Sequence, residues 1–262
     1  MRIAPGIHRI GVGLVNAYLL EEGREVTIVD AGAPSYWDDL ARELETMGRS
    51  LADVRALLLT HAHVDHVGFA ERLRRERGVA VRVHELDARL ARGEVTPKNQ
   101  SFAGPRPLPV LRFLAFAVTH GLLRATPILE VATFGDGATL DVSGSPRVIH
   151  MPGHSEGSAA LHVPARDALF VGDAIATLNV LSGATGPQIA AFGSDIPGAY
   201  ASLARLRGVE AALVLPGHGA PWTGGVGEAR DRTRWVSDRA FADGEGGAAR
   251  ADAQHQVAGP DA

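Results

Sequence analysis

Apolar runs of two kinds alternate along the chain. Short runs bounded by glycine, proline or aspartate are typical of strands. They occupy residues 7–10, 14–20, 26–29, 54–59, 79–83, 147–151, 158–163 and 168–171. Apolar positions at helical spacing predict helices over 35–48, 67–77 and 197–207, the first of them with Ser35 as N-cap and Gly48 as its stop. The sequence therefore predicts a mixed α/β (α+β) protein with strands and helices in both halves.

Residues 85–130 differ in character from the rest of the chain. Four prolines between 97 and 109 precede the apolar segment 110–123, which contains Phe113 and Phe116. We interpret the region as an insertion that caps a site and lines a pocket for a lipophilic substrate, with packing on the core or on a second subunit as the alternative. If both phenylalanines line the pocket, replacing them with alanine should raise KM for long-chain substrates more than for short ones.

The densest chemical signal follows the expected strand 54–59. His61, His63, Asp65 and His66 fall within six residues at a strand-to-helix turn. In an extended segment His61 and His63 point to the same side and share one cation, whereas Asp65 and His66 come after the turn and address a second one. A solvated, histidine-rich loop is the alternative, but four such ligands at this spacing favour metal.

Three later candidates each follow an apolar run. His154 and His218 stand in Gly-His pairs and Asp173 in a Gly-Asp pair, which places them at one edge of a sheet. Asp30 closes the run 26–29 and is either a partner of a ligand histidine or a turn former. We expect structural roles for His84 and His150.

Composition narrows the class of protein. The chain has no cysteine, so a metal must be held by nitrogen and oxygen ligands. A formal charge of −4 disfavours nucleic-acid binding and favours a small-molecule substrate. The N-terminal residues lack the apolar core of a signal peptide, and no stretch is long and apolar enough for a membrane span, so we expect a cytoplasmic protein.

Taken together, these candidates resemble the ligand set of the metallo-β-lactamase superfamily over residues 1–222. The resemblance implies a four-layer αββα sandwich with two divalent metal ions, for which we expect Zn²⁺, with Fe or Mn as alternatives. It implies that His61, His63 and His154 bind the first metal and Asp65, His66 and His218 the second. Asp173 would bridge both together with a hydroxide. We expect Asp65 to be the catalytic proton acceptor or donor. Residues 223–262 are expected to form one helix and a disordered tail.

The dinuclear branch that includes glyoxalase II and quorum-signal lactonases is the most similar. Only about forty residues follow His218, which is too few for the helical domain of glyoxalase II, and Ala174 follows Asp173 where lactonases carry a nearby tyrosine. Asp173 also argues against β-lactam hydrolysis as the main role. We expect a metal-bridging hydroxide to attack the carbonyl of a thioester, lactone or related acyl ester. The alternatives are a mononuclear iron persulfide dioxygenase-like enzyme, a β-lactam or phosphodiester hydrolase, and a non-catalytic metal scaffold. The oligomeric state is left open, with a homodimer among the options.

Overall fold

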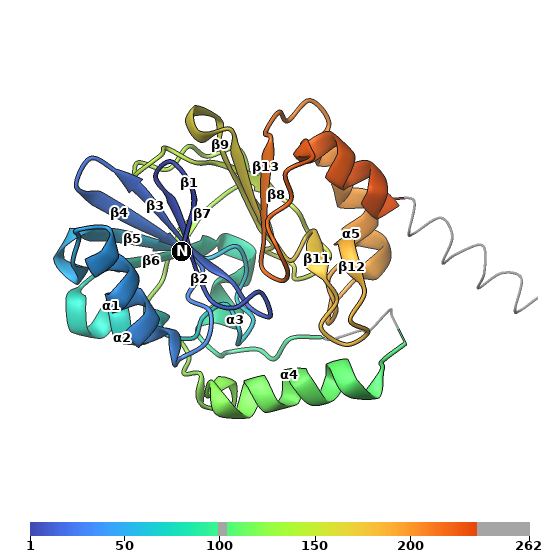
Figure 1. Cartoon of the computed structure of the whole chain (residues 1–262), viewed down its shortest axis with the longest axis horizontal. Helices are drawn as coiled ribbons and strands as arrows, with labels where there is room; N and C mark the ends of the chain where they lie inside the picture. The colour runs from blue at the N-terminus through green and yellow to red at the C-terminus, as the bar shows by residue number, and fades with distance from the viewer. Residues whose placement is uncertain (99–103, 235–262) are drawn as a thin grey trace, which may run out of the picture.

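The computed structural model describes residues 1–98 and 104–234. Its first sheet has seven strands in the order β1 to β7 (Figure 1). Strands β1 to β4 are antiparallel, and β4 to β7 run parallel. Their bounds are Arg2–Ala4, Ile7–Ile10, Ala17–Glu22, Glu25–Val29, Val54–Leu58, Ala80–His84 and Ala132–Phe134.

The second sheet has four strands in the order β13-β10-β9-β8, with β10 and β13 parallel. These strands are Leu213–Pro216, Ala168–Gly172, Ala159–Val163 and Arg147–His150. A separate hairpin joins β11 (Ala176–Leu178) to β12 (Thr185–Gln188). The carboxyl ends of β4, β5, β10 and β13 carry the predicted chemical groups, because the segments that contain those groups follow these strands directly.

The alternation of side chains along the strands builds the layers. Leu19 and Leu57 of the first sheet pack against α1 (Tyr36–Thr46) and α2 (Ala70–Arg77). Their chain neighbours Leu20 and Leu58 face the opposite way and pack against Phe170 of the second sheet. The result is a core between the two sheets and another beneath the helices.

The outer face of the second sheet has its own helices. Leu169 and Val171 pack against α5 (Ile196–Ser202) and against the helix at 225–234. Helix, sheet, sheet and helix therefore follow one another through the molecule (Figure 1). This confirms the predicted αββα sandwich.

Several element boundaries differ from the prediction. The strand expected over 14–20 begins at Ala17, because Asn16 instead donates hydrogen bonds to the carbonyls of Pro216 and Gly219. The helix expected from Val67 begins at Ala70, since Gly68 lies against the backbone of residues 32–33. Ser35 is the N-cap residue of α1, as predicted, but its side chain makes no capping hydrogen bond.

The helix expected over 197–207 is α5 followed by a 3₁₀ segment, Leu203–Leu206. The sequence also did not predict β1, β7, β11, β12 or the short α3 (Ala88–Ala91). The expected tail from residue 242 lies outside the described residues.

Helix α4 (Pro107–Thr119) lies at one end of the sandwich (Figure 1). The helix was expected over 110–123 but begins earlier, at Pro107. Proline is accommodated there because the first turn of a helix needs no backbone N–H. Phe116 packs against Tyr36, and Phe113 lies beside Phe192. The outward face exposes Leu108, Leu111, Leu114 and Val118. Within the described residues, no helix has the length and apolar character needed to cross a membrane.

Candidate metal centre

The seven predicted ligands lie together at one edge of the two sheets. They come from the segments that follow β5, β8, β10 and β13, and all of them are buried. Their nitrogen and oxygen atoms form three groups within which every pair of ligand atoms lies within 4.8 Å. The groups are His61, His63 and His154; His61, His66 and Asp173; and Asp65, His66 and His218. Both halves of the chain thus contribute to one polar centre.

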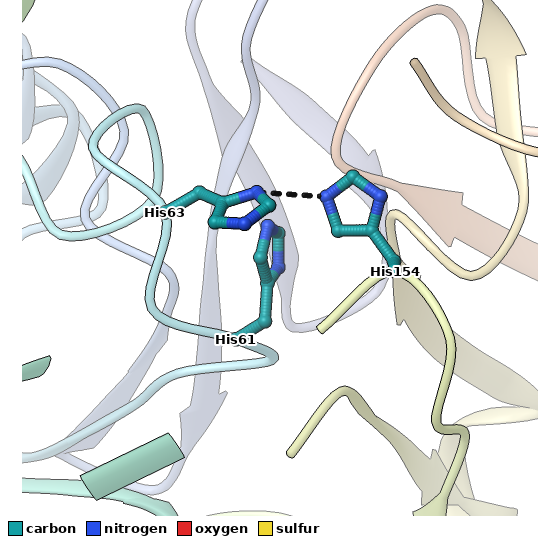
Figure 2. Close-up of side chains that lie close together, drawn as sticks. All are labelled: His61, His63 and His154. Carbon is teal, nitrogen blue, oxygen red and sulfur yellow. Dashed lines mark hydrogen bonds between the residues drawn. The ribbon is translucent and has the colours of Figure 1, made fainter. Parts of the chain in front are cut away.

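His61, His63 and His154 form a cluster of imidazoles (Figure 2). Their ring centroids are 4.6 to 4.7 Å apart, and Nδ1 of His63 is 2.9 Å from Nε2 of His154. Burial lowers the pKa of all three side chains, to about 3 for His154. Three neutral imidazoles with converging nitrogens are suited to one transition-metal cation.

Asp173 occupies the middle of the centre. Its Oδ2 lies 3.2 Å from Nε2 of His154 and 3.1 Å from Nε2 of His218, and its Oδ1 lies 3.5 Å from Nε2 of His66. Asp65 approaches Nε2 of His218 at 3.4 Å. Asp173 therefore touches histidines of both expected metal positions.

The charges around the expected second metal position offset one another. Burial would lower the pKa of His66, but Asp30 and Asp173 raise it to about 10. Burial likewise opposes protonation of His218, and Asp173 with Asp65 raises its pKa to about 9. Burial would raise the pKa of Asp173, yet the adjacent histidines, His218 foremost, hold it well below its usual range. Three carboxylates thus favour the protonated, positively charged forms of His66 and His218.

Neighbouring groups fix the orientation of these histidines. Nδ1 of His66 lies 2.9 Å from Oδ2 of Asp30, whose carboxylate also accepts bonds from the N–H and hydroxyl of Thr60. Nδ1 of His218 bonds the carbonyl of Leu14. Asp30 is thus a partner of a ligand-candidate histidine as well as a turn residue, with φ +60°. With Nδ1 engaged in this way, Nε2 of each ring is directed to the centre.

The atoms left without partners fit a metal. Nε2 of His61, Nε2 of His66 and Oδ1 of Asp173 are buried and have no hydrogen-bond partner among the described residues. Buried polar atoms of this kind are costly unless something pairs with them. Nitrogen and oxygen donors of this number and type can bind zinc, iron or manganese.

Asp87 is a buried residue of the centre that the sequence analysis missed. Its carboxylate accepts hydrogen bonds from the N–H of Ala62 at 3.0 Å, the hydroxyl of Ser155 at 2.7 Å and the N–H of Gly157 at 2.7 Å. It thereby ties the segment between His61 and His63 to the loop that carries His154. Nothing in its local sequence distinguishes it from an ordinary acidic residue after a strand.

A hollow of about 240 Å³ opens beside His63 and His154. One wall comes from residues between 86 and 98, with Leu86, Leu90, Val95 and Pro97 as its apolar members and Asp87, Arg89 and Lys98 as its charged ones. Neither Phe113 nor Phe116 is among the described residues that line it. The part of the 85–130 region nearest to this hollow is therefore its first third.

His84 and His150 stack on each other, with ring centroids 4.3 Å apart and planes 9° apart. Neither belongs to a group of metal-ligand candidates among the described residues. Their structural roles stay a prediction.

A sandwich of two sheets with a buried histidine and aspartate cluster at the edge defines a class of metal-dependent hydrolases. The sequence profile of the metallo-beta-lactamase superfamily matches residues 10–218, and the chain belongs to this superfamily.

Among related proteins, the chain is 26% identical over 237 residues to the probable metallo-hydrolase YflN of Bacillus subtilis, covering 84% of this chain and 86% of YflN. It is 31% identical to the acyl-coenzyme A thioesterase MBLAC2 of Bos taurus, covering 78% of this chain and 72% of that protein. The structure of TTHA1623 in a di-iron-bound form matches with a TM-score of 0.55 and 29% identity, covering 84% of this chain and 94% of that one. These similarities support a metallo-hydrolase.

Proposed function

We propose that this protein is a dinuclear metal-dependent hydrolase of thioesters, lactones or related acyl esters. The observation that carries the proposal is the position of Asp173. Its carboxylate oxygens lie 3.1 to 3.5 Å from nitrogens of His66, His154 and His218, which are expected to bind different metal ions. A single structural cation would need only one of the groups. The thioesterase MBLAC2 among the relatives favours a thioester within this set of substrates.

We assign the first cation to His61, His63 and His154 and the second to Asp65, His66 and His218, with Asp173 shared between them. Two divalent cations held there would supply an activated water and polarise the substrate carbonyl. Zinc is our expectation, and the di-iron form of TTHA1623 makes iron the alternative to test.

The protein's own groups handle the protons. In hydrolysis the bond from the acyl carbon to sulfur or oxygen breaks, water supplies hydroxyl to the acyl carbon, and a proton goes to the leaving group. Asp65 is our candidate for that proton's carrier, because its side chain keeps 13% exposure at the rim whereas Asp173 keeps 3%. Asp30 and the carbonyl of Leu14 hold His66 and His218 in place through Nδ1.

The hollow beside His63 is our candidate for the acyl part of the substrate. The apolar side chains of its wall suit a short or medium chain, since its volume is about 240 Å³. In this proposal residues 1–222 form the catalytic domain, and residues 85–130 serve as the cap.

The test is proton release by metal-loaded protein against a panel of acyl thioesters, lactones, β-lactams and phosphodiesters. His61→Ala, which lacks one ligand candidate, is the control. We expect turnover of a thioester or lactone that is absent in the control. Silence toward acyl substrates, with turnover of a β-lactam or phosphodiester, would contradict the proposal. Oxygen consumption with a persulfide by protein carrying one iron would do so as well.

A further inference from the structure

A second groove lies beside His218, apart from the acyl hollow. Its volume is about 610 Å³, and it runs between β2, the loop 12–14, the β11–β12 hairpin, helix α4 and residues 219–223. A neighbouring hollow of about 280 Å³ below α4 shares Leu14, Arg112, Leu178 and Thr185 as lining residues. The two hollows therefore adjoin each other, with these four residues between them.

The groove shares its wall with the metal centre. Leu14, whose carbonyl bonds Nδ1 of His218, is a lining residue, and so is Gly219, which follows His218 in the chain. Thr177 also lines the groove, and its N–H donates to the carbonyl of His218 at 2.9 Å. A molecule bound in the groove would therefore contact residues that are adjacent to His218 in the chain or hydrogen-bonded to it.

The charge of the groove has a single sign. Arg9 and Arg112 line it, and none of its described lining residues is acidic. Neither arginine forms an ion pair with a described residue, and Nε of Arg9 is buried without a hydrogen-bond partner. The acidic residue near the Trp222 end, Glu228, is paired with Arg232.

The groove therefore carries positive charge in a protein whose formal charge is −4. Guanidinium groups bind carboxylates and phosphates through paired N–H donors, and such charge-assisted bonds are stronger than neutral ones. The hydroxyl of Thr185 adds a polar group along the same wall, whereas that of Thr177 donates to the carbonyl of Ala220 at 2.6 Å. The lining thus matches an anionic group.

We propose that this groove binds an anionic group, phosphate or carboxylate, on the thiol or alcohol portion of the substrate, through Arg9 and Arg112. The acyl part would then extend to the hollow beside His63, and the leaving group would lie along the groove. This inference rests on the proposed acyl-hydrolase function and names the substrate class within it: acyl thioesters or esters whose leaving group is negatively charged.

The experiment compares three thioesters with the same short acyl chain. One is the coenzyme A thioester, which carries phosphates; the second is the glutathione thioester, which carries carboxylates; the third is the neutral N-acetylcysteamine thioester. Each is assayed with wild type, Arg9→Gln, Arg112→Gln, and the control Arg55→Gln, whose guanidinium is exposed and paired with Glu25 elsewhere on the surface.

We expect Arg9→Gln and Arg112→Gln to lower kcat/KM for a charged thioester by about 10-fold or more, mainly through KM, from the loss of a charge-assisted bond. The neutral thioester should change less than about twofold, as should every substrate with Arg55→Gln. Arg9→Lys should restore part of the loss. An effect limited to the coenzyme A thioester identifies phosphate, and one limited to the glutathione thioester identifies carboxylate. Equal effects on charged and neutral thioesters would overturn the proposal.

A binding measurement separates this inference from the proposed function. Adenosine 3′,5′-diphosphate and glutathione contain the anionic groups without a scissile bond, so calorimetric titration needs no turnover. Binding by wild type that weakens in both arginine variants supports the groove even if every thioester is inert. Absence of binding of both anions to wild type would overturn it even if a neutral thioester is hydrolysed.

Discussion

Asp65 differs from the other ligand candidates in lying at the rim of the centre. Its side chain keeps 13% exposure, and its Oδ2 is 3.4 Å from Nε2 of His218. A carboxylate at this place can exchange a proton with substrate or solvent, whereas Asp173 is enclosed. The two aspartates therefore should respond differently to amide substitution.

Asp65→Asn should lower kcat by about 10²- to 10⁴-fold, the usual contribution of a general acid or base, while most of the bound metal is retained. The measurement combines steady-state kinetics with metal analysis of the same sample. Asp173→Asn, the comparison, should lose metal and activity together. If Asp65→Asn loses the two in parallel as well, Asp65 is only a ligand.

Asp87 is not a metal-ligand candidate, but it bonds the segments of both chain halves that carry such candidates. Asp87→Asn keeps the size of the side chain but presents an amide N–H to one of the three donors from Ala62, Ser155 and Gly157. We expect metal affinity to fall by about 10- to 100-fold, as for other groups that orient ligands. Chelator competition measures it.

Asp136→Asn provides the matched control for Asp87. Asp136 also accepts a backbone N–H, from His150 at 2.8 Å. It lies on the surface, pairs with Arg205, and bonds no ligand candidate among the described residues. Its substitution should leave metal affinity unchanged. A loss of thermal stability in Asp87→Asn with unaltered metal affinity would reduce Asp87 to a general structural role.

At the scale of elements, the sequence predicted what local pattern determines. The strands 7–10 and 26–29 and the helix that begins near residue 35 follow from alternation and helical spacing, and the cluster at 61–66 follows from the density of ligand side chains. Asp87 could not be predicted, because its role depends on donors 25 and 70 residues away in the chain. The start of α2 at Ala70 depends likewise on the approach of Gly68 to residue 32.

Helix α2 contains an ion pair with a definite pH dependence. Glu71 accepts bonds from Nε and a terminal nitrogen of Arg74 and from the N–H of Leu129, and these bonds, Arg74 foremost, lower its pKa from 4.5. A lowered pKa in the folded state means that the ionised carboxylate stabilises the fold above its ordinary pKa. That contribution is lost as pH falls through the folded-state pKa.

Glu71→Gln should therefore be less stable than wild type near neutral pH, by up to about 1 kcal/mol. The difference should shrink as pH falls below 4.5 and through the lowered pKa of Glu71, because wild type then loses the charge as well. Urea denaturation at a series of pH values measures both curves. A difference that stays constant from neutral to acidic pH would show that Glu71 acts through packing and not through its charge.

At the scale of the whole molecule, the centre joins the two sheets. His61, His63, Asp65 and His66 follow β5 of the first sheet, whereas Asp173 and His218 follow β10 and β13 of the second. The unfolded chain cannot bring these segments together, so cations that bind here bind the folded state selectively. Metal binding should then stabilise the whole sandwich by mass action.

Removing the metals should lower the melting temperature without abolishing the fold, since two sheets with apolar cores remain. At a free metal concentration of about 100 Kd the stabilisation is about 2.7 kcal/mol, which for a chain of this size corresponds to roughly 5 to 10 °C. Calorimetry with and without a chelator measures the shift, and Zn²⁺ or Fe²⁺ added back in separate samples should restore it. His218→Ala, which removes a ligand candidate from the second sheet, should show a smaller shift than wild type. If metal analysis shows that the chelator has removed two cations per chain and the melting temperature does not move, the centre does not hold the two sheets together.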